Sequence, residues 1–376
     1  MTIKVKYIDL PKQFRDEGFW AVLKEQFEAC QFIMGPELEK FESNFAELCQ
    51  TPFALGVNSG TDALFLSLKA LGIGSGDEVI TVPNSFVATT GAIIATGAKP
   101  VFVDVGPDYN INVDLIERAI TIRTKAILPV HLTGNPADMI RIMEISQKYM
   151  LYVIEDAAQA VMASINGQRV GSFGDTGCFS LHPLKNLIVC GDGGVITTKS
   201  EEIYEKIRLM RNHGLKNRDE IECFGYNSRL DNIQASIANY MMKKLQWVTQ
   251  ERVKNAKLYD NALKGLYDFV TLPPRKEDVE QVFHTYVIQF KYRADLIKYL
   301  SEHGVETKIH YPILIHLQNP CRKYGYKKGD FPVCEKQVDE ILSLPIHQYL
   351  NEEQIYYVVD RIKKFYEVRK FYEVRK

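Results

Sequence analysis

The stretch from residue 54 to residue 156 alternates short, continuously apolar runs with amphipathic segments. We expect strands at 54–57, 78–82, 101–105, 126–130 and 152–156, and helices at 62–72, 85–96, 112–120 and 137–149. Apolar strands that alternate with helices are typical of a mostly parallel β-sheet covered by helices on both faces. The sequence therefore predicts an α/β fold in which ligands bind beyond the carboxyl ends of the strands.

A change of composition at residues 272–278 indicates that a second domain follows the first. Before this change, the spacing of apolar residues predicts helices at 201–211 and 230–245. After it, the sequence predicts a strand at 285–290, a helix at 294–303, a strand at 305–309 and a last helix that begins after Asn351. These elements predict a smaller α+β domain at the carboxyl end. We place the large domain, with its N-terminal segment, at 1–250 and the small domain at 251–376.

The composition excludes several classes of protein. The 376 residues include 46 lysines and arginines against 47 aspartates and glutamates, so no basic surface for nucleic acid is expected. No apolar run approaches the ~18 residues of a membrane span, and seven cysteines without CxxC pairs indicate neither a disulfide framework nor a metal site. We expect a cytoplasmic protein whose partners are small molecules or other subunits. The hexapeptide FYEVRK at 365–370 is repeated at 371–376, and we assign it no function.

Lys185 lies on a loop between two apolar runs that end at Ser180 and begin at Val195. An amine attacks an aldehyde only when it is deprotonated, and partial burial lowers a lysine pKa toward about 7–8. The position therefore predicts a lysine that forms a Schiff base. A solvated surface charge is the alternative, since it is the usual state of a lysine.

Asp156 closes an apolar strand, so its carboxylate needs a cationic partner, and a protonated pyridine nitrogen would be one. A helix N-cap or a structural ion pair is the alternative role. Gln159 follows three residues later and can reach the same ligand. Phe86 can stack on a flat aromatic ring, although spacing alone favours core packing.

A strand, a turn and a helix N-terminus surround Ser59, Gly60 and Thr61. Free N–H groups at a helix N-terminus bind phosphate, and an ordinary N-cap is the alternative. A lysine for an aldehyde, a carboxylate for a pyridinium, an aromatic ring and a phosphate site together describe pyridoxal 5'-phosphate.

Five runs carry a family resemblance: GVNSGTDAL at 56–64, PNSFVAT at 83–89, EDAAQA at 155–160, FSLHPLKNL at 179–187 and GYNSRLDNIQA at 225–235. The chain resembles, from about Phe32 to Leu350, the DegT/DnrJ/EryC1 nucleotide-sugar aminotransferases, which are fold-type I pyridoxal phosphate enzymes. The resemblance implies that the large domain holds a mostly parallel sheet and that the small domain is α+β.

The resemblance also implies roles for individual residues. It assigns the Schiff base to Lys185, the pyridine nitrogen to Asp156, the ring hydroxyl to Gln159, the ring face to Phe86 and the phosphate to Gly60, Thr61 and Ser180. Asn227 would reach the phosphate of the neighbouring subunit, which implies a homodimer with shared active sites.

The residues within these motifs indicate which reaction the resemblance implies. A sister branch of sugar 3-dehydratases has histidine where this chain has Lys185, so the resemblance implies transamination. The run from Lys185 to Gly194 resembles enzymes that aminate 3-keto sugars, although Ile188, Val189 and Cys190 depart from the small residues usual there. The implied substrate is a nucleotide-linked keto sugar of the dTDP-3-keto-6-deoxyhexose kind, and the implied amino donor is L-glutamate. Such enzymes serve deoxyamino-sugar biosynthesis, for example for lipopolysaccharide O-antigen.

The nucleotide half of the substrate needs other residues. Candidates are His310, Tyr311 and His316 in a loop of the small domain, and Arg229 and Lys216 near the expected subunit contact. A guanidinium fork suits a diphosphate, and a solvated surface role is the alternative for each.

The same residues are compatible with two functions besides amination at C3. Amination at C4 of a 4-keto sugar and a non-catalytic regulator that binds pyridoxal phosphate remain alternatives. A nicotinamide-dependent enzyme is excluded because no GxGxxG follows the first strand.

Overall fold

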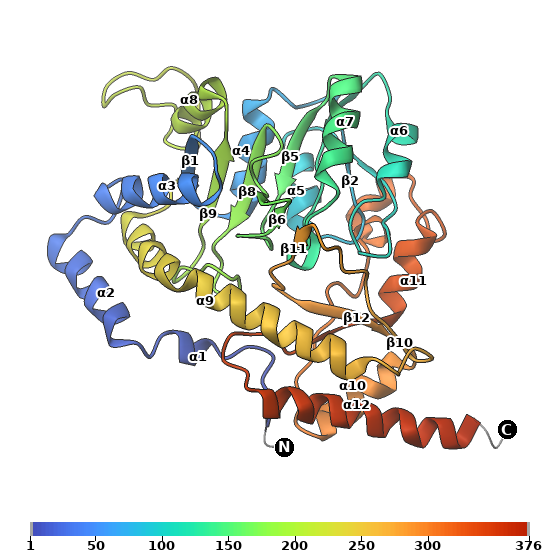
Figure 1. The fold of residues 1–376 in the computed structure, drawn as a ribbon. Coiled ribbons are helices and arrows are strands. Elements are labelled where there is room, and N and C mark those ends of the chain that lie inside the picture. Colours follow the sequence, from blue (N-terminus) through green and yellow to red (C-terminus); the bar gives the residue numbers. More distant parts are fainter. Residues whose placement is uncertain (1–2, 374–376) are drawn as a thin grey trace.

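A seven-stranded sheet forms the centre of the computed structural model, which describes residues 3–373 (Figure 1). Its strands, in spatial order, are β1 (Phe53–Val57), β9 (Gly194–Thr198), β8 (Thr176–Ser180), β5 (Tyr152–Asp156), β4 (Thr124–Ile127), β2 (Glu78–Thr81) and β3 (Lys99–Phe102). Only β9 runs antiparallel to its neighbours β1 and β8, and the other pairs are parallel. The predicted α/β fold with a mostly parallel sheet is confirmed.

Helices cover both faces of this sheet because successive strand residues point to opposite sides. On β5, for example, Ile154 packs into the core beneath α4 (Gly60–Ala70), α5 (Val87–Ala95) and α8 (Glu201–Met210). The neighbouring Val153 faces α6 (Ile116–Ala119) and α7 (Met139–Tyr149) on the other side. The same face continues over β1 and β9 beneath α3 (Pro36–Leu48) and the first half of α9 (Asn232–Leu263).

The small domain is built on a second sheet with the order β10-β12-β13. Its strands are β10 (Val270–Thr271), β12 (Tyr286–Phe290) and β13 (Ile341–Leu344), and its helices are α10 (Arg293–Glu302), α11 (Pro332–Glu340) and α12 (Glu352–Glu373). Its core also takes in the second half of α9 and, from the start of the chain, Val5. The predicted α+β composition of this part is therefore observed.

The remaining elements are short or peripheral. A third sheet joins β6 (Ser164–Ile165), β7 (Gln168–Arg169) and β11 (Val279–Glu280). The N-terminal helices are α1 (Leu10–Gln13) and α2 (Glu17–Ala29), and the 3-10 turns are η1 (Val113–Leu115), η2 (Leu132–Gly134), η3 (Ile315–Leu317) and η4 (Asn319–Tyr324). Among residues 3–373, no helix is long and apolar enough to cross a membrane.

The helix α9 runs through both domains as one continuous rod (Figure 1). The expected domain boundary at residue 250 falls inside this helix, and the ranges 1–250 and 251–376 stay a prediction. The expected helix at 230–245 is thus the first half of a longer one.

Two expectations about the carboxyl end have different outcomes. The strand expected at 305–309 is wrong, because Val305 and Lys308 make only isolated bridges, to Val5 and Ser343 respectively. The hexapeptide at 365–370 continues α12, and the last three residues of its repeat, 374–376, lie outside the described part of the chain.

Candidate active site

Lys185 lies on the loop between β8 and β9, near the carboxyl ends of β5 and β8. Its backbone N–H donates to the carbonyl of His182 at 2.8 Å, and its side chain is half-buried. Burial lowers the pKa of Lys185 to about 8, although the nearby carboxylate of Asp156 favours the charged form. The amine is therefore not the solvated surface charge of the alternative interpretation.

Asp156 closes β5, and only 5% of its surface is exposed. One carboxylate oxygen accepts from the hydroxyl of Thr89 at 2.7 Å, and the other accepts from the backbone N–H of Ala158 at 3.2 Å. Burial raises the pKa of Asp156, and the hydrogen bond from Thr89 opposes that rise. None of the ion pairs among residues 3–373 involves Asp156. A buried carboxylate that forms no ion pair with any described residue suits a cationic ligand.

The hydroxyl of Thr89 also lies 2.6 Å from the hydroxyl of Ser85. Because Thr89 gives its proton to the carboxylate, Ser85 must donate to Thr89. This pair of hydroxyls holds Asp156 in one orientation. The pair was not predicted from the sequence, although a helix at 85–96, as expected there, would put residues four apart on one face; in the structure Ser85 lies two residues before α5.

Gln159 is held from two sides. Its side-chain oxygen accepts from the backbone N–H of Thr133 at 2.7 Å, and its amide nitrogen donates to the hydroxyl of Tyr311 at 3.3 Å. Thr133 itself has a left-handed backbone with φ 64° and was not predicted as a site residue. The three residues come from three separate loops, so the fold fixes the direction in which the amide of Gln159 points.

Phe86 precedes α5 and leaves 53% of its surface exposed. Its ring centroid lies 5.7 Å from that of Tyr311. The core-packing alternative for Phe86 is wrong, because a ring so exposed is available to a ligand.

The turn before α4 is closely packed against the start of the Lys185 loop. The hydroxyl of Ser59 caps the helix by accepting from the backbone N–H of Asp62 at 3.1 Å. A Cβ on Gly60 would lie 2.8 Å from the Cβ of Ser180, so only glycine allows this approach. The first N–H groups of α4, at Gly60 and Thr61, have no acceptors within the helix. Ser180, Gly60 and Thr61 therefore meet at one place that suits phosphate.

Three histidines share the surroundings of Lys185. Burial and the charge of Lys185 lower the pKa of His182, His284 and His310, that of His310 to about 4. His310 also shares a hydrogen bond of 2.8 Å with the hydroxyl of Ser343. All three rings are neutral near pH 7, so they add no positive charge beside the lysine. His284 was not singled out from the sequence, and no motif marks it.

Asn227, the residue predicted to reach the cofactor phosphate of a neighbouring subunit, lies close to the predicted substrate residue Arg229. Asn227 is exposed and forms an isolated bridge with Asn212, whose side-chain oxygen accepts from Arg229 at 2.9 Å. Lys216 lies in the loop that runs from Asn212 to Asn227. None of these three residues enters the hydrogen bonds around Asp156 and Gln159.

His316 is a correction to the predicted substrate site. Its ring is 1% exposed, lies 3.1 Å from the carboxylate of Glu335 and stacks edge-on against Phe331 with centroids 4.7 Å apart. A ring enclosed in this way has no surface left for a ligand, so we do not retain His316 as a substrate contact.

The groups that the chain brings together fit pyridoxal phosphate. They comprise an amine of lowered pKa, a buried carboxylate outside any ion pair, an exposed aromatic ring and a cradle that a Cβ would fill. On an α/β fold with these groups beyond the strand ends, this combination defines the class of pyridoxal phosphate-dependent enzymes.

Comparison with known families makes the assignment specific. Residues 14–363 match the model of the DegT/DnrJ/EryC1/StrS aminotransferase family, and the chain belongs to this family. The predicted family, cofactor and fold-type I architecture are thereby confirmed, as is the prediction of a pyridoxal phosphate-dependent sugar-nucleotide transaminase.

Three curated relatives illustrate the range of similar proteins. A UDP-N-acetyl-3-dehydro-alpha-D-glucosamine 3-aminotransferase of Acidithiobacillus ferrooxidans is 42% identical and aligns over 96% of this chain and 97% of its own. A dTDP-3-amino-3,4,6-trideoxy-alpha-D-glucose transaminase of Streptomyces venezuelae is 37% identical over 97% of both chains. A pleiotropic regulatory protein of Geobacillus stearothermophilus is 41% identical over 97% of this chain and 99% of its own.

Solved structures agree with the fold. DesV of S. venezuelae, in complex with a ketimine intermediate, superposes with a TM-score of 0.94 at 37% identity, covering 97% of this chain and 99% of its own. NtdA of Bacillus subtilis, with bound cofactor PMP, superposes with a TM-score of 0.88 at 34% identity, covering 96% and 86%.

Proposed function

We propose that this aminotransferase moves an amino group from L-glutamate to C3 of a nucleotide-linked 3-keto sugar, of the dTDP-3-keto-6-deoxyhexose kind. The observation that carries the reaction type is the half-buried Lys185, with a pKa of about 8, beside the buried carboxylate of Asp156. The choice of C3 rests on the run from Lys185 to Gly194 and on two similar relatives, one named for a 3-amino sugar and the other for a 3-dehydro sugar.

Pyridoxal phosphate, when bound, supplies an aldehyde for the amino group and a ring that accepts electrons. Lys185 would hold the aldehyde carbon and, once displaced by an amino donor, take a proton from one carbon and return it to another. Its pKa near 8 leaves part of the population as free amine near neutrality, which this transfer requires.

The other site residues would bind and orient the cofactor. Asp156 would accept the N–H of the pyridine nitrogen and keep that nitrogen protonated. Gln159 would donate to the ring hydroxyl, and Phe86 would lie on the ring face. Gly60, Thr61 and Ser180 would hold the phosphate through N–H and hydroxyl donors.

The sugar nucleotide would lie between the small-domain loop and the neighbouring subunit. His310 and Tyr311 border the cofactor pocket from the small domain, and the neutral ring of His310 can donate or accept a hydrogen bond. Arg229, together with Lys216 of the loop between Asn212 and Asn227, would bind the diphosphate of the substrate.

Asn227 would reach the cofactor phosphate of a second copy of the chain, which requires a homodimer. Its neighbours Phe224 and Ile221 are 94% and 55% exposed, and apolar side chains gathered on one excursion are typical of an interface. The cytoplasmic location remains a prediction from the sequence.

The test is to incubate the purified enzyme with glutamate and a panel of 3-keto and 4-keto nucleotide sugars, and to locate the new amine by NMR. Amine at C3 supports the proposal, and amine at C4 contradicts the regiochemistry. Lys185→Ala serves as the inactive control. A pleiotropic regulatory protein is among the similar relatives, so binding of the cofactor without turnover of any sugar would favour the regulator instead.

A further inference from the structure

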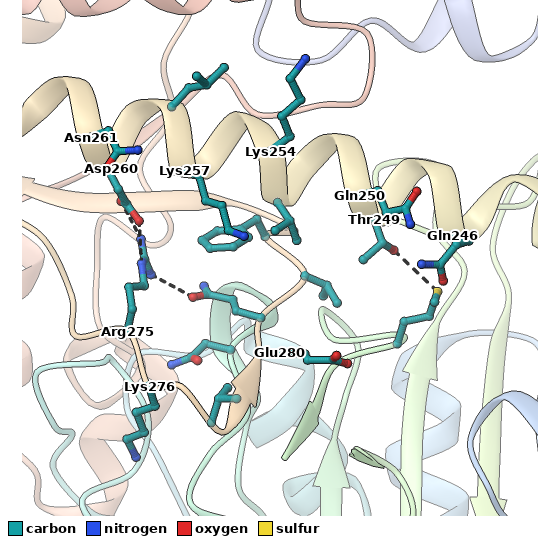
Figure 2. A pocket seen from close by; sticks show the side chains of 18 of the residues that line it. Gln246, Thr249, Gln250, Lys254, Lys257, Asp260, Asn261, Arg275, Lys276 and Glu280 are labelled. Atoms are coloured by element: carbon teal, nitrogen blue, oxygen red, sulfur yellow. Dashed lines mark hydrogen bonds and ion pairs between the residues drawn. The ribbon is translucent and has the colours of Figure 1, made fainter. Parts of the chain in front are cut away.

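A cavity of about 780 Å³ lies between the second half of α9 and the segment 275–283 (Figure 2). Arg169 of the β6–β7 hairpin and Met162 close another side of it. This volume is within the range of small-molecule sites. None of the predicted site residues lines the cavity, so the proposed aminotransferase reaction leaves it without a role.

The cavity is more positive than the rest of the chain. Five cationic and two anionic residues line it, and even without Lys254, which pairs with Glu352 outside the cavity, the cations outnumber the acids; in the whole sequence the two are balanced. Both acids already have partners: Asp260 accepts from Arg275 at 3.0 Å and from the hydroxyl of Tyr286, while Glu280 accepts from Arg169 at 3.0 Å. An anion that enters therefore meets uncompensated positive charge.

Two lysines on the same helix differ in what they face. Figure 2 shows Lys257 reaching from α9 toward the middle of the cavity, while Lys254 extends away from it. Lys254 is 3.0 Å from the carboxylate of Glu352. Lys257 takes part in none of the ion pairs found among residues 3–373. Its ammonium group is thus free to hold a ligand.

The rest of the lining indicates what the ligand looks like. Five side-chain amides surround the space: Asn135, Gln246, Gln250, Asn261 and Gln281. Amides offer paired donors and acceptors to hydroxyl groups. Phe283 is the single aromatic side chain of the lining, and the guanidinium of Arg275 already lies 5.0 Å from its centroid. A nucleobase therefore finds no open ring to stack on.

We propose that this cavity is a second binding site, for a phosphorylated and hydroxyl-rich small molecule such as a sugar phosphate. Lys257 holds the phosphate, and the side-chain amides that α9 presents to the cavity, Gln246 and Gln250, hold the hydroxyls. The site is separate from the cofactor pocket and does not depend on which sugar carbon is aminated.

Calorimetric titration of the holoenzyme with glucose 1-phosphate tests the proposal. The comparison is between Lys257→Gln and Lys254→Gln, which remove the same charge from the same exposed helix. We expect Lys257→Gln to weaken binding about tenfold or more, since it loses a charge-assisted hydrogen bond, and Lys254→Gln to change it less than about twofold. Glucose and UMP, which lack the phosphate or bring a nucleobase, should bind more weakly than glucose 1-phosphate.

The proposal is overturned if the wild type does not bind the probe, if Lys257→Gln binds it as well as the wild type, or if both variants lose affinity equally. Because the readout is binding, failure of the proposed transamination would leave the result unaffected. Unchanged thermal unfolding of both variants excludes a folding defect.

Discussion

The pKa of Lys185 has a measurable consequence. Only the free amine attacks the aldehyde of pyridoxal phosphate, and the fraction of free amine rises with pH up to the pKa. We expect the rate at which the apoenzyme takes up the cofactor to rise about tenfold per pH unit below pH 8 and to level off above it. Stopped-flow absorbance measures this rate. A profile that still climbs at pH 10 would show that the lysine has its ordinary pKa.

Thr89 is the second residue whose role can be isolated. Loss of its hydroxyl removes a hydrogen bond to a buried carboxylate, raises the pKa of Asp156 and weakens the hold of that carboxylate on a protonated ring nitrogen. We expect Thr89→Val to slow transamination about tenfold and to loosen cofactor binding in equilibrium dialysis, while Thr89→Ser stays near the wild type.

The Thr89→Val and Thr89→Ser variants distinguish the hydrogen bond of the Thr89 hydroxyl from the packing of its methyl group. If Thr89→Ser is as impaired as Thr89→Val, then the methyl group and not the hydroxyl matters, and the positioning role is wrong.

Single residues of the site were predictable where a short stretch of sequence is enough to indicate their role. Lys185, Asp156 and Phe86 are marked by their place after a strand or on a loop. Thr133 and His284 gain their roles only through contacts between segments far apart in sequence, such as the bond from the N–H of Thr133 to Gln159. A pattern along the chain does not contain those contacts.

Elements were predictable where an apolar run and a strand coincide. β5 begins and ends as expected at Tyr152 and Asp156 because neighbouring strands cover both its sides. β3 starts at Lys99, two residues before the expected run, since Lys99 pairs with Glu78 in register and in an ion pair of 3.3 Å. A run of apolar residues indicates which side chains are buried, whereas the bounds of a strand depend on its backbone pairing with a neighbouring strand.

The second half of α9 escaped prediction for a similar reason. Its buried face includes the polar residues Arg252 and Asn255, which interrupt the apolar spacing after Val248 while the helix continues. Nη1 of Arg252 donates to the carbonyls of Phe283, His284 and Ile346. Helical periodicity does not foresee a buried guanidinium that is held by backbone carbonyls.

At the scale of the whole molecule, the proposed homodimer predicts complementation. Lys185→Ala and Asn227→Asp are each expected to be nearly inactive, the second because a carboxylate repels the partner's phosphate. Mixed dimers contain one site with both natural residues, so a mixture refolded together should recover about a quarter of the wild-type activity. Steady-state assays of the mixture measure the recovery.

The matched control mixes Lys185→Ala with Asp156→Asn, two residues that one subunit supplies to its own site. This pair should recover nothing, because every site then carries one defect. Recovery in neither mixture would place Asn227 outside the neighbouring site.

The helix α9 is fastened at both ends. In its first turn Asn232 bonds the backbone N–H of Leu38 at 3.0 Å, and further along Arg252 and Asn255 bond backbone carbonyls of the small domain. A helix bonded to both domains does not act as a hinge. Rotation of one domain relative to the other would break these hydrogen bonds or bend α9. We therefore expect the two domains to move as one block, and substrate entry and release to depend on the loops that contain Asn227 and Tyr311.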